Sequence, residues 1–194
     1  GASIGGGGRD LALNQVTADF ARIGGGAGNL AGGYASILGG GENNAAGGSY
    51  GVVAGGASNT ASGPYAVVVG GQTNAVTATH ALIGGGGSNQ VTGAYGVVGG
   101  GSQNHVTAEH ASIGGGSYNL AVAAFGTIAG GGPSDPGNPT TTNNRVVDAY
   151  GTIAGGGGNL AGTDDAAPEA QPYAAVGGGM DNVAGGAYAT VSGG

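Results

Sequence analysis

The segment from His105 to His110 carries the residues best suited to metal chemistry, with Glu109 between the two histidines in the sequence. Zinc motifs of this kind place two histidines on one face of a helix. The residues around them predict a strand and a turn instead, so the two imidazoles fall at different points of one coil. We therefore expect no bound metal and no other cofactor.

Residues 47–51 read Gly-Gly-Ser-Tyr-Gly and match the Gly-x-Ser-x-Gly pattern of hydrolase nucleophiles. That pattern needs a strand before the serine and a helix after it. Here a further strand is predicted, and no histidine or acid is placed to complete a triad. The glycine runs also lack a following helix that would bind phosphate, and no aspartate recurs every nine residues as in calcium-binding rolls. We expect a protein that is not an enzyme.

The element that must position all these residues is a repeat, marked by an asparagine every fifteen residues over eight copies. A fixed period of this kind is typical of a stacked solenoid. Asparagine and the nearby Gly-Gly pair suit the positive φ of tight turns, and stacked asparagine side chains can hydrogen-bond turn carbonyls. With three later copies, the predicted turn ladder consists of Asn14, Asn29, Asn44, Asn59, Asn74, Asn89, Asn104, Asn119, Asn144, Asn159 and Asn182.

Each repeat predicts two short strands. Nine residues after the asparagine lies a β-branched residue such as Val53 or Ile83, and Ile37 is assigned to this slot after a shift in register. A glycine or alanine stands two residues earlier, so both side chains share one face of a strand. A second strand follows the asparagine. The prediction is an all-β parallel β-roll, in which about eleven or twelve coils rising roughly 4.8 Å each give a rod on the order of 55 Å long.

A large ring recurs six residues after the asparagine, on the outer side of the predicted coil, and Tyr34 and Tyr173 are assigned to the same position after shifts in register. Because one roll has a thin core and a soluble monomer rarely exposes a continuous apolar stripe, we interpret the rings as a contact with neighbouring chains. A platform on which sugars stack is the alternative. The stripe consists of Phe20, Tyr34, Tyr50, Tyr65, His80, Tyr95, His110, Phe125, Tyr150, Tyr173 and Tyr188.

Two insertions interrupt the repeat, at residues 133–142 and 163–172, and both are rich in proline and small or polar residues. Insertions in solenoids form loops on one face and often carry binding, although long surface loops are also tolerated without a function. The candidate binding residues in the two loops are Pro133, Asp135, Asn138, Asp164, Asp165 and Glu169.

Composition narrows the classes of protein further. The chain has 52 glycines among 194 residues, but they cluster once per repeat and not at every third position as in collagen. It has no lysine and only three arginines against ten acids, which disfavours nucleic acid and anionic membranes as partners. No stretch is long and apolar enough for a transmembrane helix, and no signal peptide is evident. We expect residues 1–194 to be a single β-roll domain, a fragment of a longer fibrous protein.

The repeated phrase Tyr-Ala/Gly-x-Val/Ile-x-Gly-Gly-x-x-Asn-x-Ala/Val-x-Gly/Ala resembles the head repeats of trimeric autotransporter adhesins of the YadA-like type. The best-known heads repeat at fourteen residues, whereas the fifteen-residue form with Gly-Gly-x-x-Asn looks like the head of the ubiquitous surface protein family. The resemblance implies a left-handed parallel β-roll, a homotrimer, and a virulence-related adhesin. Such a head is extracellular, binds a matrix protein or a glycan, and is held in the outer membrane by a C-terminal region outside this chain.

Two other functions stay open. Similar repeats occur in phage and environmental fibre proteins, so the chain also looks like a tail-fibre segment of a phage or injection system, with a structural and receptor-binding role. Ice binding is the third hypothesis, because Thr77, Thr92 and Thr107 follow successive asparagines at the same distance. That threonine array is interrupted elsewhere and lacks a paired Thr-x-Thr column, which favours hydroxyls that simply line a half-exposed strand.

Overall fold

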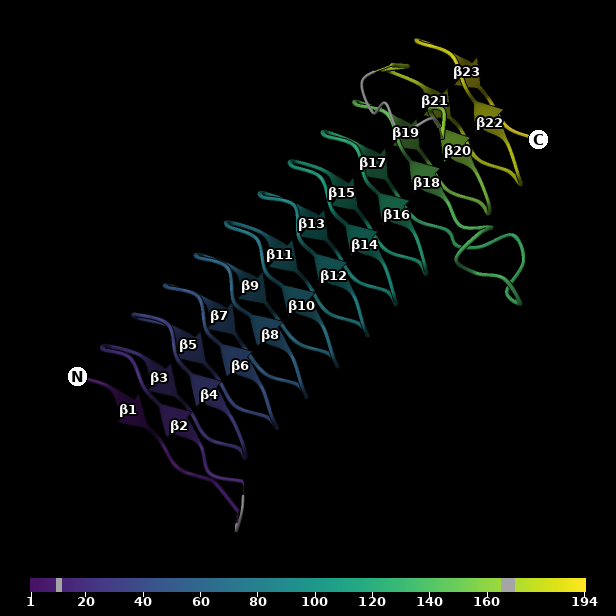
Figure 1. Cartoon of the computed structure of the whole chain (residues 1–194). Helices are drawn as coiled ribbons and strands as arrows, with labels where there is room; N and C mark the ends of the chain where they lie inside the picture. Colours follow the sequence, from purple (N-terminus) through teal and green to yellow (C-terminus); the bar gives the residue numbers. More distant parts are fainter. Residues whose placement is uncertain (10–11, 165–169) are drawn as a thin grey trace. The chain divides into compact units, whose positions relative to one another are not determined.

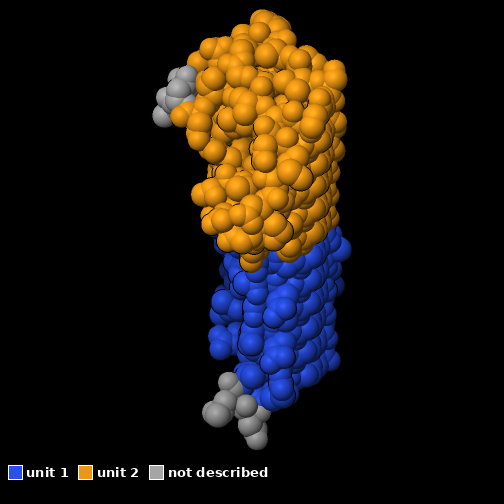
Figure 2. Space-filling model, turned by 90° about the vertical axis from the view of Figure 1, so that its right-hand side faces the viewer, with its two compact units in different colours: residues 1–92 blue, residues 93–194 orange. Residues whose placement is uncertain are grey.

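The computed structural model describes residues 1–9, 12–164 and 170–194. The described residues form a parallel β-solenoid of about twelve coils, with about fifteen residues per coil and no helix. The prediction of an all-β parallel roll is confirmed. The chain divides into two compact units, residues 1–92 and residues 93–194, which are coloured separately in Figure 2.

In the first unit, each coil contributes strands of two residues to two parallel sheets, whose rows are visible in Figure 1. Neighbouring strands pair one repeat apart, so that Val53 lies beside Val68. In spatial order, the first sheet holds β1 (Ser3–Ile4), β3 (Arg22–Ile23), β5 (Ile37–Leu38), β7 (Val52–Val53), β9 (Val67–Val68) and β11 (Leu82–Ile83). The second sheet holds β2 (Gln15–Val16), β4 (Leu30–Ala31), β6 (Ala45–Ala46), β8 (Thr60–Ala61), β10 (Ala75–Val76) and β12 (Gln90–Val91).

The second unit has the same two-sheet arrangement. Its pairing keeps register past both insertions, because Thr127 pairs with Thr152 and Leu160 with Val183. Its first sheet holds β13 (Val97–Val98), β15 (Ser112–Ile113), β17 (Thr127–Ile128), β19 (Thr152–Ile153), β21 (Ala175–Val176) and β23 (Thr190–Val191). Its second sheet holds β14 (His105–Val106), β16 (Leu120–Ala121), β18 (Arg145–Val146), β20 (Leu160–Ala161) and β22 (Val183–Ala184).

The core of each coil is a single layer of small and β-branched side chains. Ala66, Val68 and Val76 are fully buried and represent one coil. Branched side chains favour the extended backbone and fill the space between the two sheets. The backbone hydrogen bonds run between coils, as when the Val67 N–H donates to the Ala81 carbonyl at 2.9 Å. Each two-residue strand therefore depends on the coils above and below it.

The assignment of Ile37 to the buried position of its strand is wrong. Leu38 is the buried residue of β5, while Ile37 points outward and is 50% exposed. Leu38 lies nine residues after Asn29, so the repeat needs no shift in register at this coil. The preference for a β-branched residue misled the assignment, because the core accepts a leucine where the spacing requires it.

The first corner of each coil uses left-handed backbone at two positions. The second glycine of the Gly-Gly pair has a positive φ, 93° at Gly56. A Cβ added there would lie 2.2 Å from the Gly71 carbonyl oxygen of the next coil, so close stacking also requires glycine. The other left-handed residue stands directly before the ladder asparagine, such as Ser58 with φ 57°. The expectation of a positive φ at the ladder asparagines is wrong.

Candidate binding surfaces

The turn ladder holds the first corner together from inside. Asn44 is 1% exposed, and its Nδ2 donates to the Gly40 carbonyl of its own corner at 3.0 Å and to the Gly56 carbonyl of the next coil at 2.8 Å. Its Oδ1 accepts the backbone N–H of Asn59 at 2.9 Å. A buried amide whose polar atoms are satisfied in this way links neighbouring coils. Asn44 therefore serves the fold, and its side chain is closed to a ligand.

The rings of the predicted stripe form a column in each unit, called here the ring columns. Most of these rings are stacked, with centroids 4.7–5.1 Å apart and planes within 11° of parallel. They stand at the second corner, on residues with positive φ such as Tyr50 at 58° and Tyr65 at 58°. The column of the first unit is Phe20, Tyr34, Tyr50, Tyr65 and His80, and that of the second is Tyr95, His110, Phe125, Tyr150, Tyr173 and Tyr188.

Tyr34 departs from this stacking for a reason that lies in the sequence. It meets Phe20 and Tyr50 edge to face, at interplanar angles of 73° and 75°. Ala35, and not Tyr34, has the positive φ of the ring position, because it stands six residues after Asn29. The tyrosine is thus one residue early and reaches the column from the side, in the T-shaped geometry that aromatic pairs also favour.

The stacked geometry limits what the ring columns can bind. A typical ring is 44–47% exposed, as at Tyr150 and Tyr65, because its neighbours cover its faces and leave the outer edge open. A sugar stacks on a ring face, whereas a neighbouring chain can pack against a row of edges. Within the described coils, the columns therefore fit a packing surface better than a sugar platform.

A second apolar surface was not foreseen. On the outer side of the first sheet, in the first unit, four successive strands present only aliphatic side chains. These are Ile37, Val52, Val67 and Leu82, called here the apolar column, and the first is half exposed while the others are partly exposed. The signal was available, since all four stand eight residues after a ladder asparagine. In the second unit, the same positions include Ser112, Thr127 and Thr152.

The first insertion is an ordered loop whose candidate residues mainly bond to one another. Asp135 accepts hydrogen bonds from Asn138 Nδ2 at 2.6 Å and from the Gly137 N–H at 2.8 Å. The bond from Asn138, and then that from Gly137, lower the pKa of the Asp135 carboxyl below its usual value. Thr142 closes the loop by donating to the Asn138 carbonyl at 2.9 Å, and Pro133 at its base is partly exposed. Asp135 and Asn138 thus shape this loop.

The second insertion is tied to the solenoid at its start. Asp164 accepts a hydrogen bond from Arg145 Nη2 of β18 at 2.7 Å. The backbone N–H of Thr163 donates to Asp148 Oδ2 at 2.8 Å. The Asp148 side chain is fully buried at a corner position that the other coils, apart from that of Thr163, fill with glycine or alanine. The role of Asp148 was missed, because one exception in a repeat gives little signal. The candidate residues Asp165 and Glu169 lie outside the described residues.

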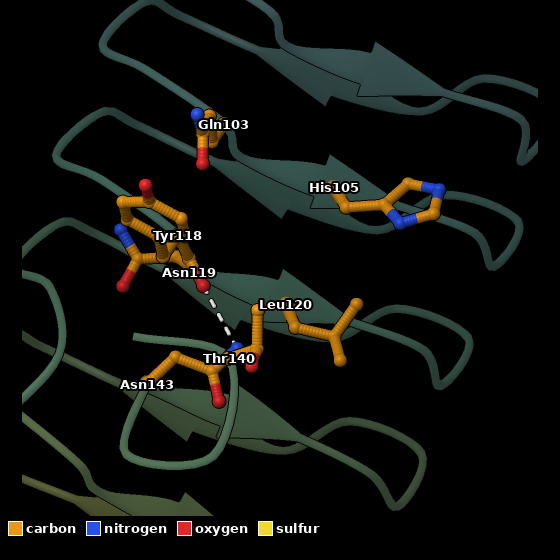
Figure 3. A pocket seen from close by; sticks show the side chains of 7 residues that line it. All are labelled: Gln103, His105, Tyr118, Asn119, Leu120, Thr140 and Asn143. Carbon is orange, nitrogen blue, oxygen red and sulfur yellow. Dashed lines mark hydrogen bonds between the residues drawn. The ribbon is translucent and has the colours of Figure 1, made fainter. Parts of the chain in front are cut away.

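A pocket of about 180 Å³ lies in the second unit, beside the first insertion (Figure 3). In Figure 3, Gln103 and Tyr118 lie on the corner side, and His105 and Leu120 lie on the side of the second sheet. Sequence reasoning missed it, because the wall comes from a loop that breaks the repeat. Its lining residues are Gln103, His105, Tyr118, Asn119, Leu120, Thr140 and Asn143.

The two histidines of the discarded zinc pattern lie in different surroundings. His105 faces outward from β14, whereas His110 is stacked between Tyr95 and Phe125 with centroids 4.7 and 5.0 Å away. Among the described residues, no three metal-ligating side chains are gathered in one place. Ser49 of the Gly-x-Ser-x-Gly pattern lies between β6 and β7, so a strand follows it where the hydrolase pattern has a helix.

In the part of the chain that the structure describes, no helix is long and apolar enough to cross a bilayer. Comparison of the sequence with protein-family models and with curated proteins gives no match.

Proposed function

We propose that the chain is a non-enzymatic adhesin head, the passenger of a trimeric autotransporter on a bacterial cell surface. In this proposal three chains assemble as left-handed β-rolls around a common axis and attach the cell to host matrix, cells or other surfaces. The observation that carries the proposal is a solenoid with a one-layer core that leaves ring edges and the apolar column open to solvent. Soluble monomers rarely expose continuous apolar strips of this kind, which mark sites of association.

Light scattering on the purified chain tests the assembly. We expect a mass three times the 17.7 kDa of one chain. The substitution Val67→Lys places a charge in the apolar column and should yield monomers with an unchanged circular dichroism spectrum. Thr127→Lys is the matched control, because Thr127 has the same outward position in the second unit and is exposed. A wild-type chain that is monomeric at micromolar concentration would contradict the trimer.

Attachment needs its own test. Binding of the wild-type chain is measured on immobilised extracellular-matrix proteins, on cultured cells and on a glycan array, with a denatured sample as the control. We expect saturable binding to at least one surface, weakened in Val67→Lys because monovalent attachment loses avidity. Failure to bind any of the three surfaces would rule out the attachment role while leaving the trimer result intact.

A further inference from the structure

Two of the residues that line the pocket beside the first insertion each have a buried polar atom that no described residue satisfies. Asn143 is 6% exposed and uses its Nδ2 to donate to the Tyr118 carbonyl at 2.8 Å, but its Oδ1 has no hydrogen-bond partner among the described residues. His105 Nε2 is also buried without a partner there. Buried polar atoms are nearly always paired, and each exception needs an explanation. Two exceptions among the lining residues of one pocket indicate a missing polar group.

The repeat is also altered at the pocket. Directly before the ladder asparagine, other coils carry a residue without an aromatic ring, such as Ser58 or Ser88, whereas here the residue is Tyr118. Residues 133–142 then add a wall, with Thr140 at the pocket. The result combines a partly exposed aromatic ring with amide and hydroxyl groups. Ligand pockets have this make-up, an apolar surface with a few fixed polar groups.

The lining restricts the chemistry of an occupant. No arginine, lysine, aspartate or glutamate is among the lining residues, which leaves a charged ligand without a counter-charge. Asn143 Oδ1 requires a donor, and His105 Nε2 can accept or donate according to its tautomer. Burial lowers the pKa of the His105 imidazole below its usual value and so favours the neutral form. Hydroxyl groups satisfy both atoms, because each one donates and accepts.

The size of the pocket points to a small molecule. A volume of about 180 Å³ is small for a ligand pocket. One pyranose ring occupies about this space, and an aromatic face such as that of Tyr118 suits its apolar C–H side. Unlike the stacked rings of the ring columns, Tyr118 stands outside them, at the other corner of the coil.

We infer that this pocket binds one neutral pyranose unit of a glycan, with Tyr118 as the stacking surface and Asn143 and His105 as partners for its hydroxyl groups. The inference rests on the attachment function proposed above, since it names a glycan as the class of ligand. It assigns recognition to one place in the second unit, separate from the ring columns and from the apolar column.

Saturation-transfer NMR on the wild-type chain tests this inference, with methyl galactoside, methyl mannoside and N-acetylglucosamine as probes. Each probe is used at about 10 mM, a concentration at which millimolar affinity is readily detected. Glycerol and sialic acid serve as polyol and anionic controls. We expect transfer to at least one neutral pyranoside and none to the controls. No transfer to any neutral pyranoside, or transfer to sialic acid alone, would overturn the inference.

Two substitutions taken from neighbouring coils locate the site without disturbing the fold. Tyr118→Gln installs the residue that stands at position 103, where φ is 55° against 57° at Tyr118. His105→Gln installs the residue found at position 90, which faces outward from β12. We expect affinity to fall at least tenfold in the first and severalfold in the second. Tyr65→Asn in the first unit should bind the sugar as the wild type does.

The outcomes separate this inference from the proposed function. If Tyr118→Gln binds the sugar with wild-type affinity, the pocket assignment is wrong, whatever the surfaces show. If the wild-type chain attaches to surfaces and no pyranoside binds, the pocket inference fails and attachment stands. If pyranosides bind and no surface is recognised, the pocket stands and the attachment function fails.

Discussion

Replacing one ladder asparagine by alanine should cost far more than its small change in volume suggests. In Asn44→Ala the backbone N–H of Asn59 loses its acceptor in a fully buried position. An unsatisfied buried donor costs about 1–3 kcal/mol. The Gly40 carbonyl loses its bond from Nδ2, but it lies at a partly exposed corner, so this loss is worth about 1 kcal/mol. The Gly56 carbonyl keeps the Glu42 N–H at 3.0 Å.

The sum is a loss of about 2–4 kcal/mol in the free energy of unfolding. Urea denaturation at fixed protein concentration measures it, and hydrogen exchange at the Asn59 amide shows whether the loss is local. Asn43→Ser is the matched control, because Asn43 is an exposed asparagine next to the ladder and serine already occupies its position in the next coil, at Ser58. We expect the control to change stability by less than about 0.5 kcal/mol.

Equal effects of the two substitutions would refute the reasoning, since they would show that the buried hydrogen bonds contribute nothing beyond the residue type. An unchanged exchange rate at the Asn59 amide in Asn44→Ala would refute it as well. In that case the N–H would have found another acceptor, and the ladder would not be what links this corner to the next coil.

Three further predictions follow from the same structure. Leu38→Ala should destabilise the fold by about 2–5 kcal/mol and Ile37→Ala by less than half as much, as measured by urea denaturation; the reverse order would restore the rejected register. Tyr65→Asn, which keeps a residue that tolerates positive φ, should cost about 1–3 kcal/mol through two lost ring contacts, and a melting temperature equal to that of the wild type would show that stacking adds nothing. Burial lowers the folded-state pKa of His105 below its unfolded value of about 6.5. The free energy of unfolding should therefore be highest above the unfolded pKa and fall as the pH drops through the lowered folded pKa. His105→Gln should flatten this part of the pH profile of stability, and an unchanged profile would contradict the burial effect.

The sequence was sufficient for the features that repeat in every coil. The fifteen-residue spacing predicts the coil length. Successive side chains of a strand point to opposite faces, so the apolar pattern of each repeat predicts that Val53 and Val68 face inward. Register is likewise set by the period, since Val53 can pair with Val68 only if each coil has the same length. Such contacts are dictated by local pattern and need no tertiary information.

Features that occur once were not predictable in the same way. The pocket depends on how residues 133–142 fold back beside Tyr118, and a loop of proline and polar residues carries no period from which its path can be read. Asp148 depends on the start of the second insertion in the same manner. The error at Ile37 has a different cause, because residue preference was allowed to outweigh spacing at a coil that contains a leucine.

The near-identity of successive coils has a consequence for how the chain finds its native alignment. A segment displaced by one whole coil would regain most of its strand pairs and glycine contacts. The repeat alone therefore gives only a small free-energy difference between the native and the displaced alignment. The two insertions and the displaced Tyr34 are places where a slipped coil meets unlike neighbours. We therefore expect these interruptions to favour the correct alignment of the coils during folding. A variant that lacks residues 133–142 should populate misaligned states more often than the unaltered chain.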